Sequence, residues 1–192
     1  RVVLYSAISL DEAEMRELEA FARPAFLIVP SAIHRMDARP WKSRYPTIQV
    51  ITPAGAREKV QEVVDVDATT VDFGDPSVRF FAVPGTGNGD AALVIERAGG
   101  TTLVLNDIIF DLENRPGLKG WLFRKVGMTA DEPHIPTPIR LLGVKDKGAL
   151  ATQLEAWGRL PELRRVIISH GDIIAEQPGE VLTRVARDLR SV

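Results

Sequence analysis

The feature that most constrains the fold is a change in the spacing of the apolar runs along the chain. The first part alternates: an apolar run of strand length at 25–29, a polar loop, a strand at 47–52 and a short helix opening at Pro53. Further strands then follow with little room for helices between them, at 78–83, 91–96 and 101–105. Because Gly99-Gly100 makes the last two a hairpin, a doubly wound parallel sheet is excluded. We predict a mixed α/β (α+β) fold, a four-layer αββα sandwich.

Several segments have the apolar spacing of helices. Ser9 as N-cap and Glu12 at N3 form a capping box that opens a helix toward Ala22. Two more helices are expected at 148–157 and 180–189. The Gly- and Pro-rich stretch between Asn114 and Lys147 is expected to hold short amphipathic turns or helices over the core, at 121–123 and 139–142.

Composition limits the possible partners. A chain of 192 residues that is 45% hydrophobic can bury one full core, so a single domain over 1–192 is expected. The net charge of −2 gives no reason to expect nucleic acid or an anionic membrane as a partner. The sequence has no Cys, which fits a reducing cytoplasm, although a Cys-free exported protein would share this feature. We expect a soluble cytoplasmic protein.

Three strand ends carry residues able to do chemistry. They are Val83-Pro84-Gly85-Thr86-Gly87-Asn88-Gly89, Leu105-Asn106-Asp107 and Ile168-Ser169-His170-Gly171. Strand ends and loops commonly carry the residues of a site. On its own, however, Asp107 could equally form a turn, and Gly171 could simply allow the chain to reverse after His170.

These strand ends, and the order of elements around them, resemble the metallo-β-lactamase superfamily. The resemblance covers nearly the whole chain. The equivalent stretches of that family usually read Pro-Gly-His-Thr, Gly-Asp and Gly-His-Gly, and each His or Asp binds a metal. This sequence has Thr86 where the first His is expected, but it keeps Asp107 and His170. The resemblance therefore implies a divergent branch with a degenerate metal motif.

The loop Ser31-Ala32-Ile33-His34-Arg35-Met36-Asp37 lies where the family has His-x-His-x-Asp-His. In one register His34 matches the second His and Asp37 the last, while other residues replace two ligands. In the neighbouring register no ligand is kept. The sequence leaves both registers open.

The resemblance implies a metal set of His34, Asp37, Asp107 and His170, with His170 and Asp107 also the catalytic candidates. With three ligands replaced, a dinuclear zinc centre is not expected, and the cofactor is either absent or one divalent metal such as zinc. Three functions stay open: a degenerate domain whose cleft binds a small molecule or a partner; a mononuclear hydrolase of an ester, thioester or lactone; and metal-free acid-base catalysis by His170, oriented by Asp107 or Asp172. Whether the chain is an enzyme is left open.

The resemblance also bears on assembly. The family fold normally begins with a hairpin ahead of a strand like 2–5, and we expect this chain to lack it. The sheet edge exposed in this way would need a cover, and a homodimer could provide one.

Overall fold

The computed structural model describes residues 1–114 and 116–191, which divide into two compact units, Arg1–Val71 and Asp72–Val192. Each unit has its own sheet and its own hydrophobic cluster. None of the described helices has the length and apolar composition needed to span a bilayer.

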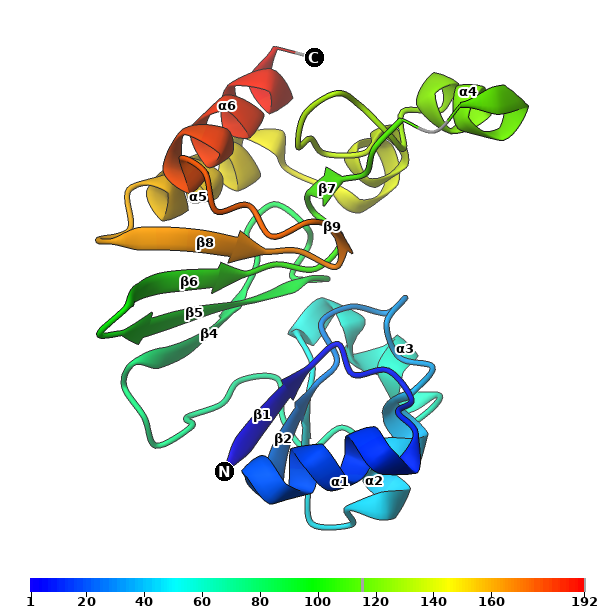
Figure 1. Cartoon of the computed structure of the whole chain (residues 1–192), viewed down its shortest axis with the longest axis vertical. Helices are drawn as coiled ribbons and strands as arrows, with labels where there is room; N and C mark the ends of the chain where they lie inside the picture. The colour runs from blue at the N-terminus through cyan, green and yellow to red at the C-terminus, as the bar shows by residue number, and fades with distance from the viewer. Residues whose placement is uncertain (115, 192) are drawn as a thin grey trace. The chain divides into compact units, whose positions relative to one another are not determined.

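The first unit is a parallel three-stranded sheet with helices packed on it (Figure 1). In chain order its elements are β1 (Val2–Tyr5), α1 (Glu12–Phe21), β2 (Pro24–Ile28), α2 (Ala38–Arg44), β3 (Gln49–Ile51), the 3₁₀ turn η1 (Ala54–Ala56) and α3 (Arg57–Gln61). The register pairs Leu27 with Val50, and both belong to the cluster that contains Met15 of α1, Trp41 of α2 and Val60 of α3. The predicted strands and the short helix after Pro53 are confirmed.

A capping box opens α1, but the prediction that Ser9 and Glu12 form it is wrong. Asp11 is the N-cap of α1: its carboxylate accepts hydrogen bonds from the backbone N–H groups of Ala13 and Glu14, and the Glu14 carboxylate accepts one from Asp11 N. An ionised N-cap also gains from the positive end of the helix dipole. Ser9 instead donates a hydrogen bond to the Asp37 carboxylate, across 28 residues.

The second unit is built on a four-stranded sheet of order β4-β5-β6-β8, with a small β7-β9 pair beside it (Figure 1). Its elements are β4 (Val78–Ala82), β5 (Ala91–Arg97), β6 (Gly100–Val104), β7 (Phe110–Asp111), α4 (Gly117–Lys125), the π-helical turn η2 (Ile139–Gly143), α5 (Lys147–Gly158), β8 (Leu163–Ile167), β9 (His170–Gly171) and α6 (Pro178–Arg190). β4, β5 and β6 pair antiparallel, which confirms the hairpin at Gly99-Gly100, whereas β6 and β8 pair parallel.

One row of side chains across this sheet forms the centre of the core. The register aligns Val94, Leu103 and Val166, and none of the three is exposed to solvent. Helices α5 and α6 lie on one face of the sheet in Figure 1, and Leu154 and Val185 from these helices belong to the same hydrophobic cluster. The two helices predicted from their apolar spacing are therefore confirmed.

The predicted helical segments at 121–123 and 139–142 are confirmed, but the expectation that 121–123 covers the core is wrong. α4 buries no residue, and Trp121, Leu122 and Phe123 are 56%, 52% and 49% exposed. In η2, Ile139 packs against the core cluster, whereas Leu141 and Leu142 are exposed. An apolar pattern with helical spacing identifies a helix, but it does not reveal whether the core lies beneath the apolar side.

The loop at 84–89 contacts the start of α5 at Gly85. The Gly85 carbonyl accepts hydrogen bonds from the backbone N–H groups of Lys145 and Asp146, at 2.7 and 3.0 Å. Gly85 has a φ of +83°, and a Cβ at this position would lie 2.4 Å from Asp146 O and 2.7 Å from Leu150 Cβ. Only glycine satisfies both the backbone angle and the close contact.

We therefore expect Gly85→Ala to lower the free energy of unfolding by roughly 2–4 kcal/mol, since the left-handed angle and the overpacking each cost about 1–3 kcal/mol. Gly87→Ala is the matched control: its φ is +65°, but the nearest atom is the flexible Lys145 Cγ at 3.3 Å, so we expect only the backbone cost, about 1–2 kcal/mol. Urea unfolding measures both. Equal losses in the two variants would contradict the close packing of the loop on α5.

Candidate functional site

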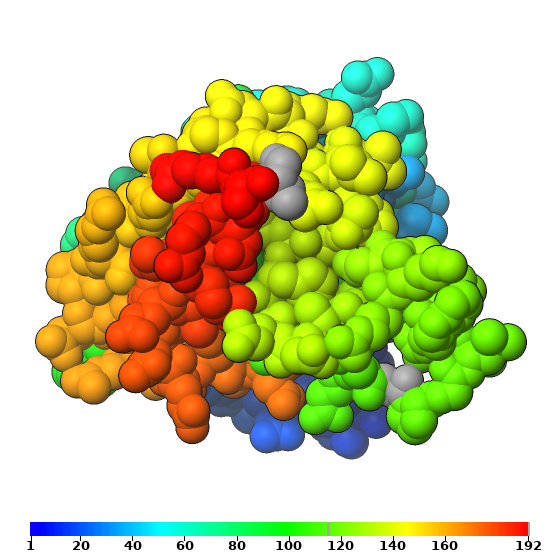
Figure 2. Space-filling view, turned by 90° about the horizontal axis from the view of Figure 1, so that it is seen from above, coloured from blue at the N-terminus to red at the C-terminus, as the bar shows by residue number. Residues whose placement is uncertain are grey.

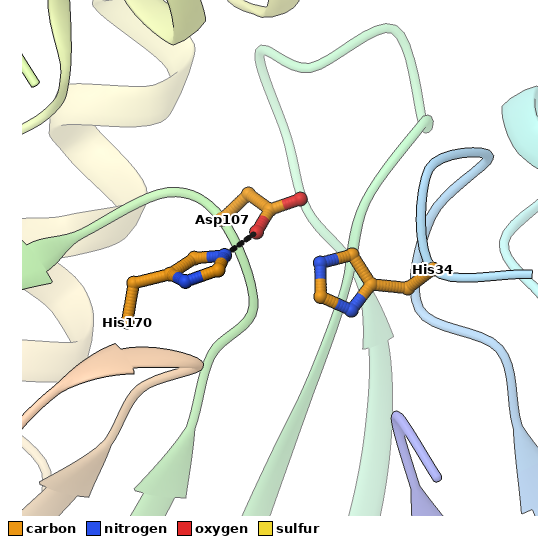
Figure 3. A group of neighbouring side chains, drawn as sticks. All are labelled: His34, Asp107 and His170. Atoms are coloured by element: carbon orange, nitrogen blue, oxygen red, sulfur yellow. Dashed lines mark ion pairs between the residues drawn. The ribbon is translucent and has the colours of Figure 1, made fainter. Parts of the chain in front are cut away.

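The register between β6 and β8 brings Asp107 and His170 together. Val104 pairs with Ile167, and Asp107 and His170 each lie three residues beyond this pair, at the carboxyl ends of parallel strands. His170 Nε2 lies 3.1 Å from Asp107 Oδ1, which Figure 3 draws as a dashed line. The two loops that follow β6 and β8 therefore place a carboxylate against an imidazole.

The pair is asymmetric in its exposure. The Asp107 side chain is 8% exposed and the His170 side chain 40% exposed, so the carboxylate lies inside the unit while the imidazole also meets solvent. A carboxylate removed from water strongly favours a partner that is positively charged or that donates a hydrogen bond to it. A protonated imidazole or a metal ion would meet this need.

Neighbouring side chains hold both loops in place. Ser169 Oγ donates a hydrogen bond of 2.9 Å to Asn106 Oδ1, which joins the residues immediately before His170 and Asp107. Asn106 is fully buried. The His170 ring also lies 4.4 Å, centroid to centroid, from the ring of Phe110, its register partner in the β7-β9 pair. Supporting roles for Ser169, Asn106 and Phe110 are not predicted from the sequence, where their only signal is that they lie within three residues of Asp107 or His170.

The other sequence candidates have separate partners in the first unit. His34 Nδ1 lies 2.7 Å from Ser6 Oγ, and Ser6 adopts a left-handed backbone angle with a φ of +52°. Asp37 accepts the hydrogen bond from Ser9 and immediately precedes α2. A role for either residue in a metal site is still a prediction.

Thr86 occupies the position where the resemblance led us to expect a His. It is buried, and its hydroxyl donates to the Val83 carbonyl at 2.8 Å and accepts from the Asp90 backbone N–H at 3.3 Å. The hydroxyl is thus engaged within its own loop. Like any neutral hydroxyl, it is a poorer zinc ligand than an imidazole.

A cavity of about 720 Å³ lies beside β9 in the second unit. Gly171, the residue after His170, is part of its lining. The remaining lining residues are Asp111, Leu112, Glu113, Pro116, Lys119, Gly120, Phe123, Thr129 and Asp172. Asp172, a sequence candidate for orienting His170, therefore lines this cavity, whereas Asp107 makes the contact with His170 Nε2.

The acidic wall of this cavity changes how Asp111 titrates. Burial, and secondarily the Asp172 carboxylate, raises the pKa of Asp111 above its usual value. The folded chain therefore holds the Asp111 proton more tightly than the unfolded chain does. It follows that this group lowers the free energy of unfolding as the pH rises through the unfolded and then the folded pKa.

We expect Asp111→Asn to raise the free energy of unfolding at pH 7, because the variant removes a disfavoured, partly buried charge. The gain should shrink at acidic pH, where the wild-type carboxyl is protonated in both states. Urea unfolding at several pH values measures the difference between the two proteins. A difference that does not vary with pH would contradict this assignment.

Comparison with known proteins supports the fold. No protein-family model matches the sequence, and no curated protein matches it. Solved structures do match: the mono-zinc form of the metallo-β-lactamase FIM-1 from Pseudomonas aeruginosa (TM-score 0.57, 13% identity, 91% of this chain and 71% of that one) and a metallo-β-lactamase from Pontibacter korlensis (TM-score 0.59, 11% identity, 97% and 81%). A metallo-β-lactamase from Hirschia baltica matches with a TM-score of 0.55 at 13% identity, over 96% and 80%.

The chain therefore has a metallo-β-lactamase-like fold, and the fold class predicted from the sequence is confirmed. At identities of 10–13% the likeness concerns the fold alone. What the chain does must be argued from its own site residues.

Proposed function

We propose that this protein is a hydrolase of esters, thioesters or lactones that uses a single divalent metal ion, held by Asp107 and His170, with His34 as the third ligand that the resemblance implies. The observation that carries the proposal is the contact between the buried Asp107 carboxylate and the His170 imidazole at the carboxyl ends of β6 and β8. Each of the three residues offers one ligand atom of a type that zinc accepts. The substrate class comes from the fold resemblance.

The geometry of the pair fits a shared ion. Two ligand atoms at tetrahedral positions, each about 2.0–2.1 Å from zinc, are separated by roughly 3.3 Å. The observed separation of 3.1 Å between His170 Nε2 and Asp107 Oδ1 is close to this value. The same distance also suits a direct hydrogen bond, so binding the ion needs little movement of either side chain.

The contact between His34 and Ser6 supports a ligand role for His34. A metal-binding imidazole commonly donates the proton of its other nitrogen to a nearby oxygen, which fixes the tautomer. If Nδ1 of His34 donates to Ser6 Oγ, then Nε2 keeps its lone pair for the ion. Ser6 would thus be a positioning residue, and its left-handed backbone would be the cost of directing its hydroxyl at the ring.

A bound divalent ion supplies a Lewis acid and makes a water easier to deprotonate near neutral pH. In the same site, the residues of the chain hold charge and orient groups. Asp107 provides the negative charge that holds a cation, and the half-exposed His170 imidazole presents Nε2 to the same ion. The Asn106–Ser169 hydrogen bond keeps both residues in their relative positions.

A specific observation favours a second candidate function. The Thr86 hydroxyl is satisfied within its own loop, so one ligand position of the family is replaced by a residue with a structural contact. This supports a domain that has lost the metal and binds a small molecule in the old cleft. The two candidates differ in whether the purified protein retains a metal.

We expect the protein purified without chelator and incubated with Zn²⁺, Mn²⁺ or Fe²⁺ to retain about one ion per chain. His170→Ala should lower the metal affinity at least about tenfold, because it removes a ligand. His134→Ala is the matched control, since the His134 ring lies near the carbonyls of Glu132 and Gly127 and has no assigned ligand role. Metal analysis after dialysis measures the retained ion. No retained metal under any loading would favour the second candidate.

We also expect Ser6→Ala to weaken metal binding about tenfold, as is typical when the partner of a ligating imidazole is removed. Asp37→Asn should leave the metal affinity unchanged if the only role of Asp37 is to accept the hydrogen bond from Ser9. Competition with a chromophoric chelator measures both affinities. Loss of metal from Asp37→Asn but not from Ser6→Ala would move the ligand role from His34 to Asp37.

A further inference from the structure

The outer surface of the second unit has an apolar area that the proposed function does not use. On α4, Leu118, Trp121 and Leu122 are 80%, 56% and 52% exposed. The side chains of Leu141 and Leu142 on η2 are 69% and 74% exposed. Isolated exposed apolar residues are ordinary, but groups of them mark interaction surfaces.

The two segments are neighbours in the fold. The backbone N–H of Thr137, two residues before η2, donates to the carbonyl of Gly127, two residues after α4, at 3.0 Å. Figure 2 looks onto this side of the unit, where the green residues of α4 adjoin the yellow residues of the η2 segment. In Figure 1, α4 projects from the unit on the side where the η2 segment lies. We call Leu118, Trp121, Leu122, Val126, Leu141 and Leu142 the α4–η2 surface.

The helix has two different sides. Lys119, Gly120 and Phe123 line the cavity beside β9, together with the carboxylates of that cavity. Residues 118, 121, 122 and 125 follow the i, i+3, i+4 and i+7 spacing and therefore share the other side. On that side lie Leu118, Trp121, Leu122 and Lys125.

Charge identifies the kind of partner. α4 contains Lys119, Arg124 and Lys125 and no acidic residue, and η2 contains Arg140 and no acidic residue. Arg124 pairs with Asp131, while the Lys125 ammonium lies over the Trp121 ring, 4.8 Å from its centroid. A second copy that presented the same helix would place these cations against each other. An anionic surface that also accepts apolar side chains would both attract the cations and cover the exposed leucines and Trp121.

We propose that the α4–η2 surface binds the interface of an anionic lipid bilayer. Leu118, Leu122 and the two leucines of η2 would enter the acyl boundary, and Trp121 would lie at the headgroup level, where its amphipathic ring is favoured. Lys125 can extend its stem along the apolar side and hold its ammonium among the lipid phosphates. The proposal is independent of catalysis.

The net charge of the whole chain hides the local charge around α4 and η2. The net charge of −2 gives no reason to expect an anionic membrane. That value, however, averages over the chain, and the stretch 117–145 contains five basic and two acidic residues. Because attraction to a charged surface acts within about one Debye length, the local balance decides binding.

The test uses the whole chain and flotation with large unilamellar vesicles of phosphatidylcholine, with and without 30 mol% phosphatidylglycerol. We expect flotation with the anionic vesicles and a blue shift of the Trp emission. Trp41 and Trp157 are only 4% and 2% exposed, so Trp121 should report the shift. Leu118→Gln/Leu122→Gln should abolish flotation, and Lys125→Glu should weaken partitioning by roughly tenfold or more.

A matched control keeps the result specific. Ile8→Gln/Phe21→Gln removes two large side chains that are 65% and 82% exposed in the first unit, and it should float as the wild type does. Absence of flotation with either vesicle would overturn the proposal, as would flotation that Leu118→Gln/Leu122→Gln leaves intact. If the chain instead has twice its mass of 21.1 kDa in solution, and the same variant makes it monomeric without any vesicle binding, the surface is a dimer interface and the lipid proposal is wrong.

Discussion

The parallel register between β6 and β8 is the constraint on which the site depends. Leu103 and Val166 lie side by side in the buried row of the sheet, so a slip of either strand would expose core residues. In the same register, Asp107 and His170 each lie three residues after the paired residues Val104 and Ile167. The burial of the core thus determines the geometry of the carboxylate–imidazole pair.

Each candidate ligand has a support of its own. Asp107 and His170 are held through the Asn106–Ser169 hydrogen bond, and His34 contacts Ser6. Thr86, in contrast, uses its hydroxyl to close its own loop. The candidate ligands His34, Asp107 and His170 thus lie in supporting contacts, whereas Thr86, at the position expected to hold a His, makes a structural contact. This uneven pattern is the reason to propose one ion rather than two.

Much of the fold could be predicted because apolar runs and glycine punctuation reflect local physics. The strands, the hairpin at Gly99-Gly100 and the helices α5 and α6 were found in this way. Two kinds of error arose where distant contacts decide. The position of Ser9 fits a capping box, yet its hydroxyl donates a hydrogen bond to Asp37, and Asp11 is the N-cap of α1. The apolar residues around Trp121 have the spacing of a helix that covers a core, yet α4 buries none of them. Supporting contacts such as that between Ser6 and His34 leave no local signal.

We propose that Asp107 and His170 are ligands to one metal ion. Crystals of the zinc-loaded protein, measured above and below the zinc absorption edge, would locate that ion. We expect one anomalous peak per chain at Asp107 and His170, with His34 as the third ligand. A peak at other residues, or no peak in crystals that hold the Asp107–His170 contact, would contradict it and leave the pair as a hydrogen-bonded element of the fold.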